Sequence, residues 1–309
     1  MLETWLVTSE GAWLHDLRSE STLGALAVAG EDGGQERALE SIAVAGGGGA
    51  FGERRSMFRQ VAERAIARLH AKPIVSARYP VVFDPRASGA LALQTITNLC
   101  RAPSRGVDRN LLPLGQRIGP ECLSVGDDPT APGLRTSLVL DDEGTPVTHA
   151  MVVRNGVVVG HLHTRETAAR AGVAPTGHGL APTLRSVPAA RPANTYVAGT
   201  QGSAAQLIEE IPLGVYVADV LGVAVEGRHV TITPAVARMI RGGQLAEPVK
   251  CAPITSDLLS LYGRLDRVAG DFSWDPSAAT LQEGGALRPV TTGAPHTRFI
   301  DLEISPLHL

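Results

Sequence analysis

The first part of the chain is predicted to form a small antiparallel sheet followed by a helix. Residues 4–30 alternate short apolar runs with polar residues around the turn Ser9-Glu10-Gly11, a pattern that indicates two or three strands. Residues 31–50 include four successive glycines and lack a periodic pattern, so we expect a mobile loop or a linker there. From Ser56 onward, apolar residues recur at helical spacing and predict an amphipathic helix packed on the sheet. These residues are Met57, Val61, Ala65 and Leu69.

A buried strand that leads directly into a helix is predicted next. Tyr79 to Phe83 is mostly apolar and runs into Asp84-Pro85. Because Asp is a favoured N-cap and Pro a favoured first helical residue, we expect a helix from Pro85 to about Cys100.

Two turns define the following segment. Residues 136–140 and 147–153 are predicted strands on either side of an acidic turn at residues 141–144. Asn155-Gly156 supplies the positive φ angles of a type I′ turn, and it therefore predicts a hairpin in which Arg154 pairs with Val157.

The rest of the chain predicts isolated helices between strands. Helices are expected at about residues 164–172, from a capping box at Ser203, and at about residues 255–268. Strands are expected around residues 241–244, at 288–292 and at 297–304. Because strands and helices do not alternate strictly, the predicted fold class is α+β, with mainly antiparallel sheets and a few packed helices.

Charge and composition narrow the function. The formal net charge is −3, and the 28 Lys and Arg residues are spread along the chain, so nucleic acid is not an expected ligand. The three cysteines are widely separated and fit a reducing cytoplasm. Residues 1–11 do not resemble a signal peptide, and no stretch is long and apolar enough to cross a membrane. We therefore expect a cytoplasmic protein.

Histidines are the first candidates for a metal site. His161 and His163 lie two residues apart, which on a strand directs both side chains to one face. The hairpin register places His149 opposite Leu162, so that His149 faces away from this pair. His178 is the remaining candidate for a third metal ligand beside His161 and His163. Zinc sites need three or four converging ligands, and a pair of histidines on a solvated strand face is commoner than a ligand pair, so the structural interpretation is favoured.

Acidic clusters at Asp127-Asp128 and at residues 141–143 are the other candidates, either for a hard cation or for paired carboxylates. Both clusters lie where turns are expected, and Asp in turns usually binds its own backbone. A serine nucleophile has little support, because Ser88 before Gly89 has no base nearby in the sequence.

The order of several short motifs resembles the TldD/PmbA family over about residues 79–303. The motifs are Gly115-Gln116-Arg117-Ile118-Gly119, Asp127-Asp128-Pro129, Asp141-Asp142-Glu143-Gly144-Thr145-Pro146, Asn155-Gly156, Gly160-His161-Leu162, Thr176-Gly177-His178-Gly179, Pro192-Ala193-Asn194-Thr195-Tyr196 and Gly214-Val215-Tyr216-Val217. The resemblance implies a shortened amino-terminal α/β region at residues 1–75 and a TldD/PmbA-like, β-rich carboxy-terminal domain at residues 76–309.

The resemblance also implies where zinc ligands would stand. Catalytic TldD-type subunits carry a His-Glu-x-x-x-His motif after the first buried strand, and a later Cys completes their site. In this chain Phe83 and Ser88 occupy the two histidine positions, Asp84 occupies the glutamate position, and Leu281 stands at the cysteine position. None of the three ligands is kept, so we expect no zinc in this chain and interpret Asp84 as a helix cap.

This loss of ligands is typical of the PmbA (TldE)-type subunit. The resemblance then implies a non-catalytic partner in a zinc metallopeptidase heterodimer, with zinc in a TldD-like subunit. The substrate would be an extended peptide, such as the leader of a modified natural product or a small unfolded protein. Candidate peptide-binding residues are His161, His163, Arg165 and His178. The alternative is a self-sufficient, metal-dependent hydrolase acting as a homodimer. The family's older label, modulator of DNA gyrase, does not agree with the charge.

Overall fold

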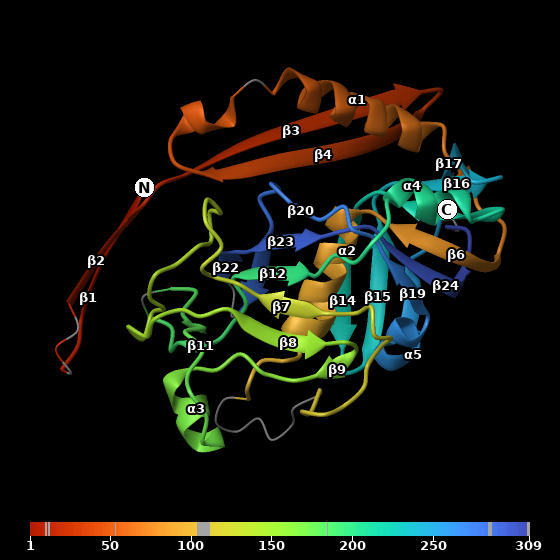
Figure 1. Ribbon diagram of the computed structural model, residues 1–309. Coiled ribbons are helices and arrows are strands. Elements are labelled where there is room, and N and C mark those ends of the chain that lie inside the picture. The colour runs from red at the N-terminus through yellow and green to blue at the C-terminus, as the bar shows by residue number, and fades with distance from the viewer. Residues whose placement is uncertain are drawn as a thin grey trace.

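The structure is a computed structural model that describes residues 1–9, 11, 13–52, 54–103, 112–183, 185–283 and 286–307. The chain begins with two antiparallel ribbons and a helix (Figure 1). Their bounds are β1 (Leu2–Val7), β2 (Trp13–Arg18), β3 (Glu20–Glu31), β4 (Gly34–Ala45), the short 3-10 helix η1 (Gly48–Phe51) and α1 (Arg55–Leu69). The β1–β2 ribbon runs beside the body and lines a cavity with residues 140–142, whereas α1 lies along the β3–β4 ribbon.

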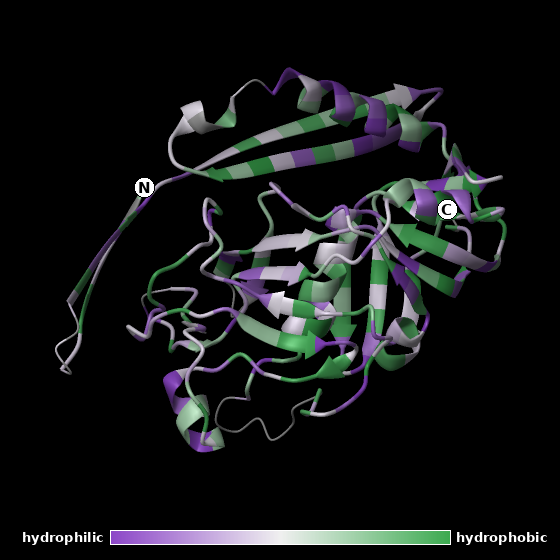
Figure 2. Ribbon diagram, viewed as in Figure 1, coloured by the Kyte–Doolittle hydropathy of each residue, from purple (hydrophilic) through white to green (hydrophobic). Residues whose placement is uncertain are grey.

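The helix α1 is amphipathic, as its spacing predicts. Met57, Val61 and Ala65 are buried and form a small core with Ala38 and Ile42 of β4. More exposed and less exposed residues alternate along β3 and over most of β4, so that one face of the ribbon meets the helix. Apolar residues are frequent in both strands (Figure 2). Burial of Met57 and Val61 stabilises this layer by about 1.5–3 kcal/mol each.

The loop predicted at residues 31–50 is wrong over most of its length. Residues 34–45 are β4, paired with β3 in an unbroken register from Glu31↔Gly34 to Glu20↔Ala45. The turn between them is Asp32-Gly33, where both residues have positive φ, at 48° and 83°. Asp-Gly between two strands is a strong hairpin signal, and it identifies this turn from the sequence alone.

Two large sheets make up the body, and most of their pairs are antiparallel. The seven-stranded sheet has the order β19 (Leu265–Val268), β24 (Thr297–Ile304), β6 (Ala77–Phe83), β13 (Leu213–Val217), β16 (Ala237–Arg241), β17 (Gln244–Lys250), β5 (Lys72–Pro73). The six-stranded sheet has the order β20 (Ser273–Trp274), β23 (Thr291–Ala294), β12 (Asn194–Val197), β7 (Val125–Asp127), β8 (Ala150–Arg154), β9 (Val157–Val158).

Smaller elements complete the body. The strands are β14 (Val220–Glu226), β15 (His229–Pro234) and β18 (Ile254–Asp257) in one sheet, β21 (Thr280–Glu283) with β22 (Ala286–Pro289), and β10 (Gly179–Leu180) with β11 (Ala189–Ala190). The helices are α2 (Pro85–Ala92), which continues as a π-helical turn η2 (Leu93–Thr97), α3 (Arg165–Ala171), α4 (Ala204–Glu209) and α5 (Leu258–Gly263).

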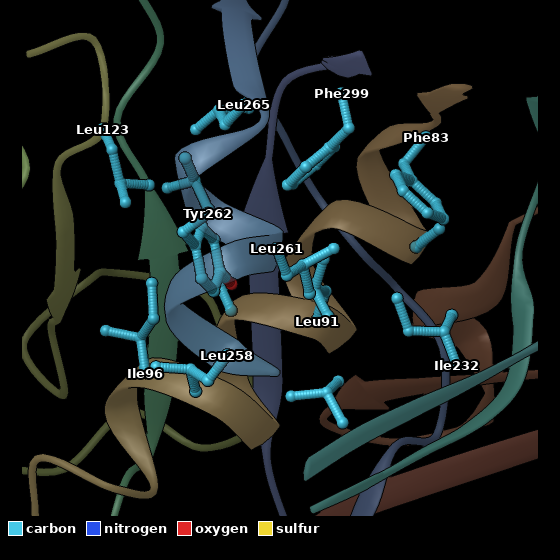
Figure 3. Close-up of a cluster of buried hydrophobic side chains, with 14 of the residues drawn as sticks. Phe83, Leu91, Ile96, Leu123, Ile232, Leu258, Leu261, Tyr262, Leu265 and Phe299 are labelled. Atoms are coloured by element: carbon cyan, nitrogen blue, oxygen red, sulfur yellow. The ribbon is translucent and has the colours of Figure 1, made fainter. Parts of the chain in front are cut away.

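The helix α2 lies at the centre of the body, between the six-stranded sheet and β14 (Figure 1). Its inner side joins the main core, where Leu91 and Ile96 are buried near the residues of α5 (Figure 3). The rings of Phe83 and Phe299 pack edge to face with centroids 5.5 Å apart, a geometry that contributes about 0.5–1.5 kcal/mol beyond burial. The sheets are therefore built around one short helix.

Several local predictions are confirmed. Asp84 caps α2 and accepts a hydrogen bond from the Ala87 amide at 2.8 Å, and Pro85 is the first helical residue. The capping box predicted at Ser203 is present in α4, and α3 ends at Gly172, as predicted, with a left-handed C-cap. In the Asn155-Gly156 hairpin, Arg154 pairs with Val157.

Other local predictions are wrong. The hairpin ladder ends at Val158, because the carbonyl of Val152 accepts from both Val159 and Gly160, and Leu162 pairs with Arg101 instead of with His149. Residues 136–140 form no strand. The last helix is limited to α5, since Asp257 caps it and residues 265–268 pair with β24.

The α+β fold class with mainly antiparallel sheets is confirmed. Among the described residues, every helix is too short or too polar to span a bilayer.

Candidate functional site

A cavity of about 480 Å³ lies where the β3–β4 ribbon meets the body. We call it the junction cavity. Its walls are residues 39–41 of β4, the outer side of α2 and η2, residues 219–223, residues 275–280, and Val290 and Thr292. A second cavity of about 500 Å³ lies beside the β1–β2 ribbon, but the junction cavity is the one lined by the helix that follows the first buried strand. It is therefore the candidate functional site.

Arg86 dominates the chemistry of the junction cavity. Its guanidinium donates to both Glu40 oxygens, at 2.7 and 3.0 Å, to Asp219 Oδ2 at 3.1 Å and to Asp275 Oδ1 at 3.2 Å. Arg64 of α1 donates to Glu40 at 2.5 Å. The result is a largely buried network in which five donor contacts are distributed over three carboxylates.

Electrostatics in this network follow from burial and pairing. Burial disfavours the charged form of Arg86, but its hydrogen bonds to Glu40 and the charges of Asp275 and Asp219 outweigh burial and raise the pKa of the guanidinium. Burial also disfavours the charged form of Glu40, but the hydrogen bonds from Arg86 outweigh burial and lower the pKa of that carboxyl. Burial raises the pKa of the Asp219 carboxyl, and the charge of Arg86 opposes this rise. The pKa shifts of Arg86 and Glu40 therefore favour the charged forms of these two partners.

Asp84 stands at the edge of this cluster. It accepts from the Asp219 amide at 3.3 Å in addition to the cap bond. Burial raises the pKa of Asp84 to about 6, with a further contribution from Asp219, while the bond from Ala87 opposes the rise. The interpretation of Asp84 as a helix cap is confirmed by these contacts.

The three positions that carry zinc ligands in TldD-type subunits are occupied here by side chains packed in the protein interior. Phe83 is fully buried against Phe299 (Figure 3). Ser88 Oγ is also buried, donates to the Phe83 carbonyl at 3.3 Å and lies 2.8 Å from Thr297 Oγ1. Leu281 packs on Leu93 and Val290, two residues that line the junction cavity. The donor set does not fit zinc, since it offers a single hydroxyl that is already bonded.

The candidate residues near α3 are neighbours in the structure. The ring centres of His161 and His163 are 6.3 Å apart. Thr176 Oγ1 accepts from the His163 amide at 2.8 Å and lies 3.0 Å from His178 Nδ1. Arg165 is the first residue of α3, and its amide donates to Glu143 Oε2 at 2.8 Å. The structure thus brings together residues that lie up to 17 positions apart, from 161 to 178.

The individual histidines are engaged by the protein. His161 Nε2 donates to the Leu112 carbonyl at 2.8 Å, and His163 is buried beside Thr167. Burial, together with the charge of His161, lowers the pKa of His163 and favours its neutral ring. Within the described part of the chain, no group of three or more His, Cys, Asp or Glu residues is arranged to hold a metal ion.

The side chains of His178 and Asp127 are in contact, and both are fully buried. Nδ1 lies 2.9 Å from the Thr176 carbonyl oxygen, and Nε2 lies 3.2 Å from Asp127 Oδ1. Asp127 also accepts from the amides of Ala193 and Asn194. Asp127 therefore belongs to β7 and not to the predicted turn, whereas Asp128 does form one with Thr130.

The second acidic cluster shapes the backbone. Asp141 is buried and accepts from the amides of Glu143, Thr145 and Gly179 at 2.8–3.0 Å. The Glu143 carboxylate accepts a hydrogen bond from the Arg165 amide in the first turn of α3. Burial raises the pKa of both carboxyls, and the backbone amides oppose this rise. The interpretation of this cluster as a turn agrees with these bonds.

The Arg86 network is not among the sites predicted from the sequence. A signal was present, because Arg86 is the only charged residue between Asp84 and Arg101 in a segment that reads as a buried helix. Arginine in such a place requires paired carboxylates. Their identity depends on tertiary structure, since Glu40, Asp219 and Asp275 lie 46, 133 and 189 residues away.

Comparison with known proteins supports the resemblance. Residues 76–306 match the model of the PmbA/TldA metallopeptidase C-terminal domain, and residues 1–70 match that of the central domain. A metalloprotease of Synechocystis is 30% identical over 302 residues, which cover 97% of this chain and 65% of the relative. This chain thus spans about two thirds of that relative's length.

Solved structures share the fold. A putative modulator of DNA gyrase from Thermotoga maritima superimposes with a TM-score of 0.76 at 24% identity, covering 96% of this chain and 65% of the other. TldE from Thermococcus kodakarensis gives 0.75 at 18% identity, with coverage of 96% and 65%. With the match of the C-terminal model over most of the chain, these findings show that the protein belongs to the PmbA/TldD metallopeptidase family.

Proposed function

We propose that this chain is a zinc-free, PmbA-type subunit that pairs with a TldD-like, zinc-bearing subunit and helps to hold an extended peptide for hydrolysis. The observation that carries the proposal is the chemistry at Phe83, Ser88 and Leu281. A phenyl ring, a bonded hydroxyl and an isobutyl group leave no means to activate a water or polarise a peptide carbonyl through zinc. In this proposal the zinc-bearing partner subunit hydrolyses the peptide.

The peptidase context rests on the family and on the metalloprotease name of the Synechocystis relative. An extended peptide is the substrate we favour, because backbone pairing tolerates many sequences. The leader of a modified natural product and a small unfolded protein both meet this description.

We further propose that the peptide passes near His161, His163 and Arg165, with His178 behind them. The proximity of these residues and the exposure of Arg165 support this path. The full burial of His178 favours a supporting role for it, in which it holds Thr176 and thereby the backbone of His163.

Other features of the proposal follow from composition. The three cysteines are free, which suits the cytoplasm, and the net charge of −3 disfavours nucleic acid as a partner. We also keep the division into regions 1–75 and 76–309 as a proposal.

Elemental analysis of the purified chain after dialysis tests the metal-free assignment. We expect no stoichiometric zinc. About one zinc per chain, lost in His161→Ala or His163→Ala, would overturn the proposal and favour a self-sufficient hydrolase. Size-exclusion chromatography with the TldD-like subunit tests the pairing, and failure of the two chains to co-elute would contradict it.

A further inference from the structure

We propose that the Arg86 guanidinium is the resident cation of the junction cavity and that it fastens the β3–β4 ribbon over this cavity. The inference goes beyond the proposed function, because it assigns a role to a residue outside the zinc-ligand positions and outside the proposed peptide path. It concerns a positioning residue, since Arg86 acts through the segments that it joins.

Arg86 joins three parts of the chain that are distant in sequence. Glu40 belongs to β4, Asp219 to the connection between β13 and β14, and Asp275 to the segment that leads to β21. Three carboxylates in one largely buried place repel one another unless a cation lies among them. The planar guanidinium supplies five N–H donors in a fixed fork and reaches all three at 2.7–3.2 Å.

The contact between Arg86 and Asp275 also links the body to the β3–β4 ribbon. Asp275 also accepts from the Ser277 amide and hydroxyl, at 3.0 and 2.6 Å, and so orders residues 275–277. This segment pairs with β4, where the Ala43 amide donates to Pro276 O at 2.9 Å and the Ala278 amide donates to Ser41 O at 3.2 Å. Arg86 therefore holds β4 directly through Glu40. It also holds β4 indirectly, through Asp275 and the backbone hydrogen bonds between residues 276–278 and β4.

The backbone conformation of Asp219 independently supports a positioning role for Arg86. Its backbone has a φ of 92°, a conformation that side chains of L residues rarely adopt. Such strain persists only where the surroundings over-determine it. Here the surroundings are the Arg86 bond to its side chain and the Asp84 carboxylate that accepts from its amide. The strained residue thus marks the place where the network is anchored to the body.

Hydrogen exchange of the isolated chain tests the inference, with the Ala43 and Ala278 amides as local probes. In Arg86→Ala we expect both amides to exchange about tenfold faster or more, because the ribbon opens locally. Millimolar guanidinium chloride should restore their protection in Arg86→Ala and leave the wild type unchanged, since the free ion has the shape of the missing group. Arg86→Lys should give intermediate rates, because a point charge cannot serve three carboxylates at once. The matched control is Arg59→Ala, an exposed arginine of α1, in which we expect wild-type rates.

Wild-type exchange in Arg86→Ala, or a folded variant that does not respond to guanidinium, would overturn the inference. If Arg86→Ala does not fold, Arg86→Lys decides, because wild-type rates there would refute the need for a three-way fork. No partner or peptide is present in this experiment. Its failure is therefore distinct from failure of the proposed pairing.

Discussion

Replacement of Asp84 by Asn should make the protein more stable at neutral pH. Asn is as good an N-cap as Asp, and its side-chain oxygen keeps the bonds from Ala87 and Asp219. The pKa of Asp84 is raised from its ordinary value of 3.8 to about 6 by burial and by Asp219. At about 1.4 kcal/mol for each pKa unit, the ionised carboxylate costs about 3 kcal/mol in the folded protein.

The sign of the pH dependence follows directly. Between pH 4 and 6 the folded protein keeps a proton that the unfolded chain has released, so wild-type stability falls as pH rises through this window. Asp84→Asn should therefore gain up to about 3 kcal/mol at pH 8 and lose this advantage towards pH 4. Urea unfolding at pH 4, 6 and 8, followed by tryptophan fluorescence, measures the difference.

Asp257→Asn is the matched control. Asp257 is likewise an N-cap, but its bond from Arg228 lowers the pKa of its carboxyl. The wild type should then be the more stable protein at neutral pH, and its advantage should shrink as pH falls. An Asp84→Asn variant that is less stable than the wild type at pH 8, or equally changed at all three pH values, would refute the reasoning.

Three further substitutions test other parts of the structure by urea unfolding. His178→Ala removes a hydrogen-bond partner of the buried Asp127 carboxylate, leaves a cavity and should cost about 2–4 kcal/mol, whereas a change below about 1 kcal/mol would refute a structural role for this contact. Gly156→Ala should cost about 2–4 kcal/mol, because φ is 75° and a methyl group would meet the Gly119 carbonyl; a neutral result would refute this turn geometry. Glu143→Gln keeps an acceptor at the start of α3 and should cost less than about 1 kcal/mol, with cleavage by the mixed subunits unchanged. A Glu143→Gln complex that assembles but does not cleave would instead show a functional carboxylate.

Local structure was predictable wherever the signal is local. The cap at Asp84, the capping box at Ser203 and the turn at Asn155-Gly156 each depend on two to four neighbouring residues, and each is present. The β3–β4 turn belongs to the same class. The loop predicted there followed from the four glycines at residues 46–49, whereas Asp32-Gly33 is the signal that agrees with the structure.

Long-range structure was not predictable in the same way. Leu162 leaves the hairpin register because Arg101, 61 residues earlier, offers a competing backbone partner. The Arg86 network depends on carboxylates from three separate segments, and no periodic pattern links them. The motif positions were identified through the family resemblance, but their packing depends on the tertiary structure. Phe83 completes the core, whereas Arg86, three residues later, faces the junction cavity.

The most direct test of the proposed function is a peptide-cleavage assay on three samples. These are this chain alone, a TldD-like subunit with an intact zinc motif alone, and their equimolar mixture, each with and without a chelator. We predict that this chain alone cleaves nothing, and that the mixture cleaves an extended peptide in a chelator-sensitive way and faster than the zinc-bearing subunit alone. Chelator-sensitive cleavage by this chain alone, or no gain in rate on mixing, would contradict the account.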